Sequence, residues 1–146
     1  MSQVILQSKF LPILFYYLNK TIKSISLPSG VTSIGNYAFY NCSSLTSITI
    51  PSSVTSIGNS AFYYCSSLAS ITIPSGVTSI GARAFASCSS LASITVEAVT
   101  PPTLGSGVFS STHADLVIYV PAESVETYKA ASGWSTYASR IQAIPS

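Results

Sequence analysis

Charged side chains are scarce in this sequence. They make up 7% of its 146 residues, well below the roughly 25% usual for soluble domains, and the formal net charge is only +2. Between Ser24 and Val96 the sole charged residue is Arg83. Because nucleic acid is recognised by a clustered basic surface, we expect no nucleic-acid partner. Serine and threonine, 43 of the 146 residues, must supply most of the polar surface instead.

Residues that carry acid–base or metal chemistry are also few. The sequence has one histidine, His113, and four scattered carboxylates. Ser110 and Ser111 precede His113 and Asp115 follows it, but no Gly-x-Ser-x-Gly nucleophile elbow or other catalytic context surrounds them. We therefore predict that His113 is a solvated loop residue and that the protein is not an enzyme. The sequence likewise suggests no cofactor and no metal site.

Long hydrophobic runs are missing as well. The longest uncharged apolar run near the N-terminus, Phe10 to Leu18, is far shorter than the roughly 20 residues that cross a bilayer, so we predict no membrane span. The run could be the apolar region of a secretory signal, but Lys9 is the only cation before it and no A-x-A-like cleavage site follows. A leader or a truncated start is therefore the alternative interpretation of residues 1–21.

The sequence is instead built from a repeated unit of 23 residues. Ser24 to Thr46 reads SISLPSGVTSIGNYAFYNCSSLT, and Ser47 to Ala69 and Ser70 to Ala92 are near copies of it. Repeats of this size indicate units that cannot bury their apolar face alone and that complete one another by stacking. The sequence therefore predicts a solenoid.

Each copy predicts the path of one coil. In the middle copy, Leu45, Ile48 and Ile50 have the spacing that points alternate strand residues into a core. Pro51 then ends the strand, since proline cannot donate a hydrogen bond to a strand ladder. The next apolar residues recur at near-helical spacing and predict a single helical or 3₁₀ turn: Ala61, Phe62, Cys65 and Leu68.

Stacking places identical side chains next to one another. We expect continuous apolar columns, the clearest being Ile25, Ile48, Ile71 and Ile94 and, beside it, Phe39, Phe62 and Phe85. The three cysteines share one phase of the repeat. Their number is odd and no C-x-x-C motif occurs, so we predict buried reduced thiols rather than a disulfide or a metal site: Cys42, Cys65 and Cys88.

The unit LTSITIPSSVTSIGNSAFYYCSSL resembles the leucine-rich repeat of the BspA-like type, over residues 22–96. The tail, from PPTLGSGVF onward, resembles the C-terminal cap that closes many such arrays. The resemblance implies a leucine-rich repeat solenoid: a right-handed β/α coil of short parallel β-strands and short helical or 3₁₀ turns. It also implies a secreted or surface-displayed binding scaffold, located outside the cell or on its surface, and it supplies no catalytic residue set.

Both ends of the array are predicted to be capped. Residues 1–21 match the repeat poorly and are expected to form a degenerate N-terminal capping repeat. Residues 97–146 are expected to contain a terminal repeat, with a strand in LVIYVP, and a C-terminal helical cap. Glu123 and Glu126 lie near the expected start of the cap helix and Lys129 lies toward its end, as the helix dipole favours. Gly133 can end this helix.

The outward face of the strands is the predicted binding surface. If Ile48 and Ile50 point into the core, Ser47 and Thr49 point outward, and stacking produces two columns of hydroxyl groups. These columns are Ser24, Ser47, Ser70 and Ser93, and Ser26, Thr49, Thr72 and Thr95. The absence of aromatic rings argues against sugar binding on this face. The alternatives are that the hydroxyl groups only keep the sheet soluble, or that they recognise a regular lattice such as ice.

These features favour a non-enzymatic scaffold for recognition or adhesion. It would bind a host or matrix protein or a glycan through the faces of the solenoid. The alternative is a structural subunit of a fibre or coat that self-associates through the ends or edges of its coils. The first interpretation predicts monomers with capped ends, and the second predicts polymers that grow with concentration.

Overall fold

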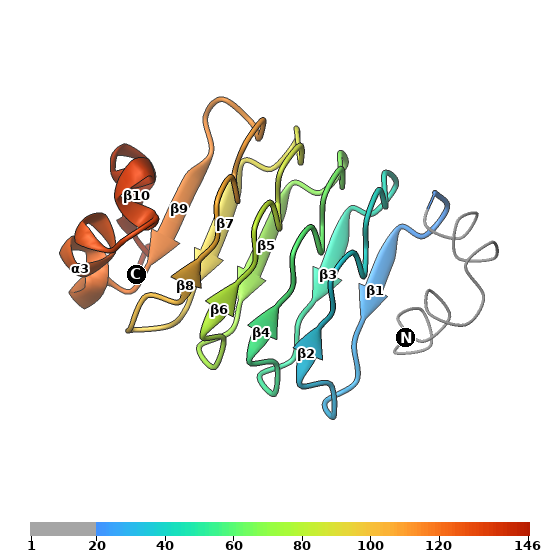
Figure 1. Cartoon of the computed structure of the whole chain (residues 1–146), viewed down its shortest axis with the longest axis horizontal. Coiled ribbons are helices and arrows are strands. Elements are labelled where there is room, and N and C mark those ends of the chain that lie inside the picture. Colours follow the sequence, from blue (N-terminus) through green and yellow to red (C-terminus); the bar gives the residue numbers. More distant parts are fainter. Residues whose placement is uncertain (1–19) are drawn as a thin grey trace.

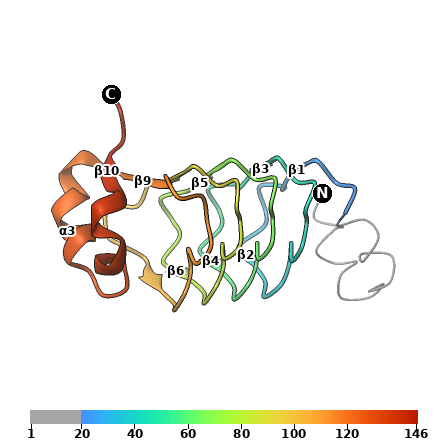
Figure 2. The ribbon, with the colours of Figure 1, turned by 90° about the horizontal axis from the view of Figure 1, so that it is seen from above.

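A computed structural model describes residues 20–146 as a stack of coils closed at the C-terminal end by a helical segment (Figure 1). Two rows of short parallel strands run along opposite sides of the stack (Figure 2). The leucine-rich repeat solenoid with a C-terminal helical cap is therefore confirmed. The predicted N-terminal capping repeat, residues 1–21, lies almost entirely outside the described residues, and the predicted domain boundaries stay a prediction.

The first row contains the strands of the L-x-x-I-x-I pattern. A two-stranded sheet consists of β1 (Ser24–Ser26) and β3 (Ser47–Thr49). A four-stranded sheet follows, in the order β5 (Ser70–Ile73), β7 (Ser93–Val96), β9 (Val117–Val120) and β10 (Ile141–Ala143). Partners in the repeat are 23 residues apart, as in Ile25 beside Ile48 and Ile71 beside Ile94. No ladder joins β3 to β5 in the described chain, so the row is divided there.

The second row was not expected from the sequence, which we interpreted as containing one strand per copy. It is an uninterrupted sheet of two-residue strands: β2 (Ser33–Ile34), β4 (Ser56–Ile57), β6 (Ser79–Ile80) and β8 (Thr103–Leu104). The isoleucines Ile34, Ile57 and Ile80 are buried, and the serines before them face outward or are half-buried. Strands this short are stable here because the inner ones are bonded to their copies on both sides.

The stretch with near-helical spacing is a series of tight turns rather than a helical turn. It closes i→i+3 hydrogen bonds, as a 3₁₀ helix does, but φ is +54° at Ser60 and +62° at Tyr64. These left-handed residues direct alternate backbone groups toward the next coil, so that Phe62 N–H donates to the Ala84 carbonyl at 2.8 Å. We call the surface formed by these turns, at residues 36–41, 59–64, 82–87 and 106–111, the turn face.

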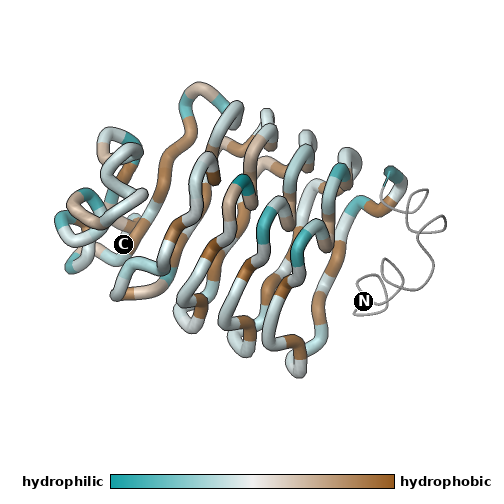
Figure 3. Tube along the Cα trace, viewed as in Figure 1, coloured by the Kyte–Doolittle hydropathy of each residue, from teal (hydrophilic) through white to brown (hydrophobic). Residues whose placement is uncertain are grey.

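The core is a stack of like side chains between the two rows. The rings of Phe39, Phe62, Phe85 and Phe109 stack with neighbouring centroids 5.3, 5.2 and 6.0 Å apart. The predicted phenylalanine column is therefore confirmed, and it continues one coil further. In Figure 3 the apolar segments recur at corresponding places in successive coils, which shows the same alignment along the chain.

The three cysteines are buried and free, as predicted. The Cys65 thiol donates to the Phe39 carbonyl at 3.2 Å, and the Cys88 thiol donates to the Phe62 carbonyl at 3.1 Å. Hydrogen bonding with Cys42 and Cys88, together with burial, raises the pKa of the Cys65 thiol far above its usual range. The thiol therefore stays protonated and helps to join neighbouring coils.

The C-terminal cap covers the last coil with two large aromatic side chains. It consists of η1 (Ala122–Ser124), α3 (Val125–Ala130) and η2 (Trp134–Arg140), with Gly133 at φ +82° between the last two helices. Tyr128 and Trp134 are fully buried. The Tyr128 hydroxyl donates to the Ala98 carbonyl at 2.6 Å, and Trp134 Nε1–H donates to the Pro102 carbonyl at 2.8 Å. Burial raises the pKa of Tyr128, so its hydroxyl stays a donor.

Candidate recognition surfaces

The hydroxyl columns predicted as a binding surface lie on the first row of strands. Ser93 and Thr95 are half-buried, and the other members are exposed: Ser24, Ser26, Ser47, Thr49, Ser70 and Thr72. Their register is the predicted one within each sheet, but both columns are interrupted where β3 and β5 lack a ladder. A hollow of about 320 Å³ opens at this interruption, beside Glu97. Binding by this face stays a prediction.

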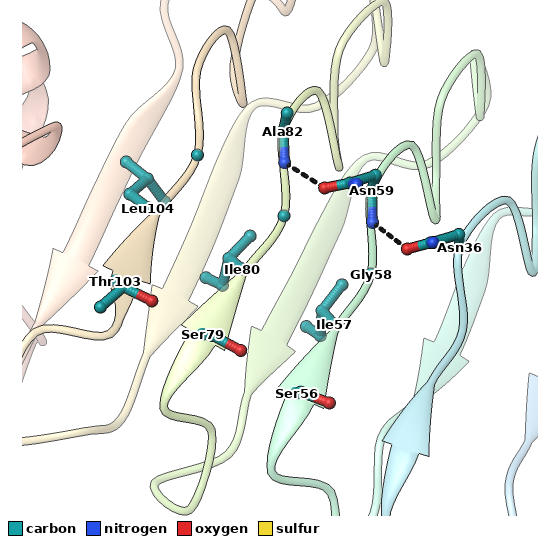
Figure 4. A pocket seen from close by; sticks show the side chains of 12 residues that line it. Asn36, Ser56, Ile57, Gly58, Asn59, Ser79, Ile80, Ala82, Thr103 and Leu104 are labelled. Carbon is teal, nitrogen blue, oxygen red and sulfur yellow. Dashed lines mark hydrogen bonds between the residues drawn. The ribbon is translucent and has the colours of Figure 1, made fainter.

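A groove of about 590 Å³ runs along the second row of strands (Figure 4). Corresponding positions of several coils line it, including the glycine column Gly58, Gly81 and Gly105. A Cβ atom on Gly58 would lie only 2.5 Å from Asn36 Oδ1 and 2.6 Å from the Asn36 backbone nitrogen. Any larger residue would therefore push the coils apart, so the glycines permit both the close stacking and the groove.

Two asparagines form the rim of this groove and brace it. Asn36 Oδ1 accepts a hydrogen bond from Asn59 N–H at 2.7 Å, and Asn59 Oδ1 accepts one from Ala82 N–H at 2.8 Å (Figure 4). The Nδ2 groups of Asn36 and Asn59 have no partner among residues 20–146. The rim is thus fixed by one side of each amide, and the other side offers hydrogen-bond donors to a ligand.

Four tyrosines form an aromatic cluster on the turn face, which we call the tyrosine cluster: Tyr37, Tyr40, Tyr63 and Tyr64. The rings of Tyr40 and Tyr63 stack across two coils with centroids 5.6 Å apart. Tyr37 lies edge-to-face against Tyr40 at 5.7 Å, and Tyr64 against Tyr63 at 4.8 Å. Tyr37, Tyr64 and Tyr40 are 58%, 48% and 40% exposed. The cluster is thus an ordered aromatic surface in contact with solvent.

The repeat itself does not require these tyrosines, because other coils place smaller or charged residues at the same positions. The third coil has Ala86 where the first two have Tyr40 and Tyr63. The counterparts of Tyr37 are Ser60, Arg83 and, after a one-residue insertion, Gly107; those of Tyr64 are Asn41, Ser87 and Ser111. All of these coils adopt the same turns. The tyrosines are therefore a property of this surface and not of the fold.

Two of the tyrosines also lie on an unfavourable backbone. φ is +60° at Tyr37 and +62° at Tyr64. This left-handed region costs most L-residues about 1–2 kcal/mol, and it suits glycine and asparagine. The other coils have the same left-handed backbone at the corresponding positions. The residues there are Gly107 and Asn41, with φ of +63° and +58°, and Ser60, Arg83, Ser87 and Ser111, with φ of +54° to +59°. The fold imposes this φ in every described coil, so the two most exposed rings of the cluster stand at positions where the other coils have glycine, asparagine, serine or arginine.

The predicted loop histidine has a local role. His113 Nδ1 accepts a hydrogen bond from the Asp115 backbone N–H at 3.0 Å, which fixes the loop around it rather than activating a nucleophile. Within residues 20–146, no group of three His, Cys, Asp or Glu side chains could hold a metal ion. None of the helices in this part of the chain is long and apolar enough to span a membrane.

Sequence reasoning missed the tyrosine cluster and the groove for two different reasons. It weighed what the copies share, whereas the signal for the cluster is where they differ: tyrosines occur on the turn face of the first two coils and not at residues 82–87. The groove depends on a second row of strands that are only two residues long. So short an element has no periodicity that a sequence could show.

Comparison with known proteins agrees with this architecture. The sequence model of the BspA type leucine rich repeat region matches residues 12–131 in six copies. The solved structure of a leucine rich cell surface protein from Faecalibacterium prausnitzii A2-165 is 38% identical, with a TM-score of 0.53, and the match covers 57% of this chain and 22% of that one. The T. pallidum leucine rich repeat protein is 26% identical, with a TM-score of 0.54, and the match covers 70% of this chain and 59% of that one.

This chain thus spans less than two thirds of either solved relative. No curated protein matches it. The family match covers most of the chain, and the paired strands and core columns within that range recur every 23 residues, as in Ile25 beside Ile48 and Ile71 beside Ile94. The protein is therefore a member of the BspA-type leucine-rich repeat family.

Proposed function

We propose that this protein is a surface-displayed recognition scaffold without catalytic activity, which binds its partner, a protein or a glycan, through the turn face. The observation that carries the proposal is the pair Tyr37 and Tyr64, two exposed rings on left-handed backbone. Exposed aromatic side chains that the fold does not need are typical of binding surfaces, where tyrosine supplies large contact area with little loss of conformational freedom.

The turn face is well suited to hold such a surface in one shape. Backbone hydrogen bonds between coils run along it, such as Phe39 N–H to the Ala61 carbonyl at 2.8 Å and Tyr64 N–H to the Ala86 carbonyl at 3.1 Å. The phenylalanine column packs directly behind it. A surface already fixed in its binding shape loses little entropy when a partner binds.

Surface display is supported by the family and by the relative from F. prausnitzii, which is described as a cell surface protein. The low charge suits recognition by shape and hydrogen bonding rather than by electrostatic attraction. The hydroxyl columns of the strand face are a second surface through which the same scaffold could bind.

The test compares three proteins for binding to a panel of immobilised extracellular matrix proteins and glycans. They are the wild type, the variant Tyr37→Ser/Tyr64→Ser, and the strand-face variant Thr49→Lys/Thr72→Lys. We expect binding that the tyrosine substitutions abolish and the threonine substitutions leave intact. Loss of binding in the strand-face variant alone would move the site to the hydroxyl columns and refute the turn-face assignment.

Light scattering of the wild-type chain, run beside the binding assay, separates recognition from assembly. We expect monomers whose mass does not change with concentration. Large polymers that grow with concentration would instead favour the structural subunit of a fibre or coat, and would contradict the proposed scaffold.

A further inference from the structure

The two coils that contain the tyrosine cluster have no charged residue. The first two coils, which contain all four tyrosines, belong to an uncharged stretch from residue 24 to residue 82. The first charged residue beyond it, Arg83, occupies in the third coil the position of Tyr37. Within these two coils an ionic ligand would lose its hydration without gaining a partner charge. The cluster is therefore matched to a neutral ligand.

The exposed area of the cluster limits the size of that ligand. The exposed fractions of Tyr37, Tyr40 and Tyr64 add up to the surface of about one and a half tyrosine side chains. An aromatic side chain has about 150–250 Å² of surface, so the exposed area of the cluster is roughly 300 Å². A stable protein interface needs about 800 Å² on each partner. The cluster is thus too small to hold a protein by itself, and its size suits a few rings of a small molecule.

The arrangement of the rings leaves flat apolar surface for stacking. Tyr37 and Tyr64 each meet one ring of the cluster edge-to-face, and that contact occupies at most one of the two faces of the outer ring. About half or more of each side chain is open to solvent. The face of an aromatic ring is electron-rich and attracts groups with partial positive charge, such as the C–H groups on the flat side of a pyranose ring.

Hydrogen-bond donors lie next to this apolar surface. Asn36 directly precedes Tyr37, and Asn59 is its counterpart in the second coil. Both line the groove, and their Nδ2 groups have no partner in the described part of the chain. A sugar combines an apolar face with hydroxyl groups at its edge, so rings for stacking and amides for hydrogen bonding are both of use to it.

From these observations we infer that the tyrosine cluster binds a short neutral oligosaccharide. Its pyranose rings stack on Tyr37 and Tyr64, and its hydroxyl groups accept hydrogen bonds from the amides of Asn36 and Asn59. This inference rests on the proposed recognition function and names the ligand class of the same surface. The absence of aromatic rings, which argued against sugars on the strand face, does not apply to the turn face.

The test is isothermal titration of the whole chain with three neutral probes, cellohexaose, N-acetylchitohexaose and mannohexaose, and one acidic probe, a heparin hexasaccharide. We expect saturable binding of at least one neutral probe and none of the heparin probe. Tyr37→Ser/Tyr64→Asn should weaken binding by about tenfold or more, which corresponds to about 1.4 kcal/mol. Tyr37→Phe keeps the ring and should change the affinity less than about threefold. Thr49→Ala/Thr72→Ala on the strand face should change nothing.

Circular dichroism and sizing of each variant establish that the solenoid is intact. If no neutral probe binds while a matrix protein binds in a tyrosine-dependent way, the oligosaccharide inference fails and the recognition function stands. If neither sugars nor proteins bind, both fail. Preferential binding of the heparin probe, or a dimer that the tyrosine substitutions dissociate, would also overturn the inference, because the occupant would then be an anion or a second copy of the chain.

Discussion

The phenylalanine column and the tyrosine cluster lie in the same coils and behave in opposite ways. Phe39, Phe62 and Phe85 recur at one position, are fully buried, and stack nearly parallel. Among the coils of residues 20–146, the tyrosines of the cluster occur in the first two. Three of the four are exposed, and two of them stand on left-handed backbone. In a repeat protein, what the copies share thus reports how the coils stack, whereas where they differ reports what the surface can recognise.

The difference has a simple physical origin. A core side chain touches its own counterparts in the coils before and after it, so a change in one copy leaves two neighbours without a fitting partner. A side chain on the turn face has solvent on its outer side, so it can change in one coil without having to fit the same side chain in the neighbouring coils. Substitutions in the two sets should therefore have opposite consequences for stability and for binding.

The largest effect is expected at the column. Phe62→Ala removes a fully buried ring held between neighbours at 5.3 and 5.2 Å, and it should lower the free energy of unfolding by about 3–5 kcal/mol. Urea unfolding followed by circular dichroism measures this. The matched control is Tyr63→Ala, the next residue in the same coil. It removes two ring contacts of about 0.5–1.5 kcal/mol each and should cost about 1–3 kcal/mol. Equal losses in the two variants would abolish the distinction.

A smaller loss is expected where the backbones of two coils meet. Gly58→Ala would place a Cβ atom 2.5 Å from Asn36 Oδ1 and 2.6 Å from its backbone nitrogen, so the free energy of unfolding should fall by about 1–3 kcal/mol. Gly30→Ala is the control, since no atom lies within 4 Å of the place its Cβ atom would take. Thermal melts of both variants test the pair, and a stable Gly58→Ala protein would show that coil stacking tolerates side chains at this position.

Substitution of Tyr128, the buried tyrosine of the cap, should lower stability, as substitutions in the phenylalanine column do, rather than weaken binding, as substitutions in the tyrosine cluster do. Tyr128→Phe keeps the ring but leaves the Ala98 carbonyl without its 2.6 Å hydrogen bond, and we expect a loss of about 1–2 kcal/mol. Chemical unfolding would detect it. An unchanged midpoint would mean that the packing of the ring, and not its hydroxyl, fastens the cap to the last coil.

The smallest change in stability is expected in the cluster. Tyr64→Asn should relieve backbone strain, because asparagine tolerates φ of +62°, as Asn41 does near this value in the first coil. The same substitution removes one edge-to-face contact, which stabilises the fold by about 0.5–1.5 kcal/mol. The two effects nearly cancel, so the unfolding midpoint should hardly move while partner binding weakens. A loss of more than about 2 kcal/mol would identify Tyr64 as a structural residue.

Much of the fold could be predicted because it depends on repetition. The 23-residue period predicted which side chains form columns, and Pro51 and its copies predicted where the strands end. The charges at Glu123 and Lys129 predicted the position of the cap helix. The predicted helical turn was wrong, since the spacing of Phe62 and Cys65 also fits a series of tight turns. The alternation along β3 placed the hydroxyl columns on the outer face, but nothing in the copies indicated that both columns break before β5.

The sequence by itself determined the stacking, because a 23-residue repeat of apolar positions leaves each coil incomplete without the next. Only the tertiary structure decided the left-handed turns and the groove, and it alone gathered four tyrosines into one surface. Those features arise from backbone angles and from contacts between coils, and residues that are 23 positions apart in the chain become neighbours only when the coils have stacked.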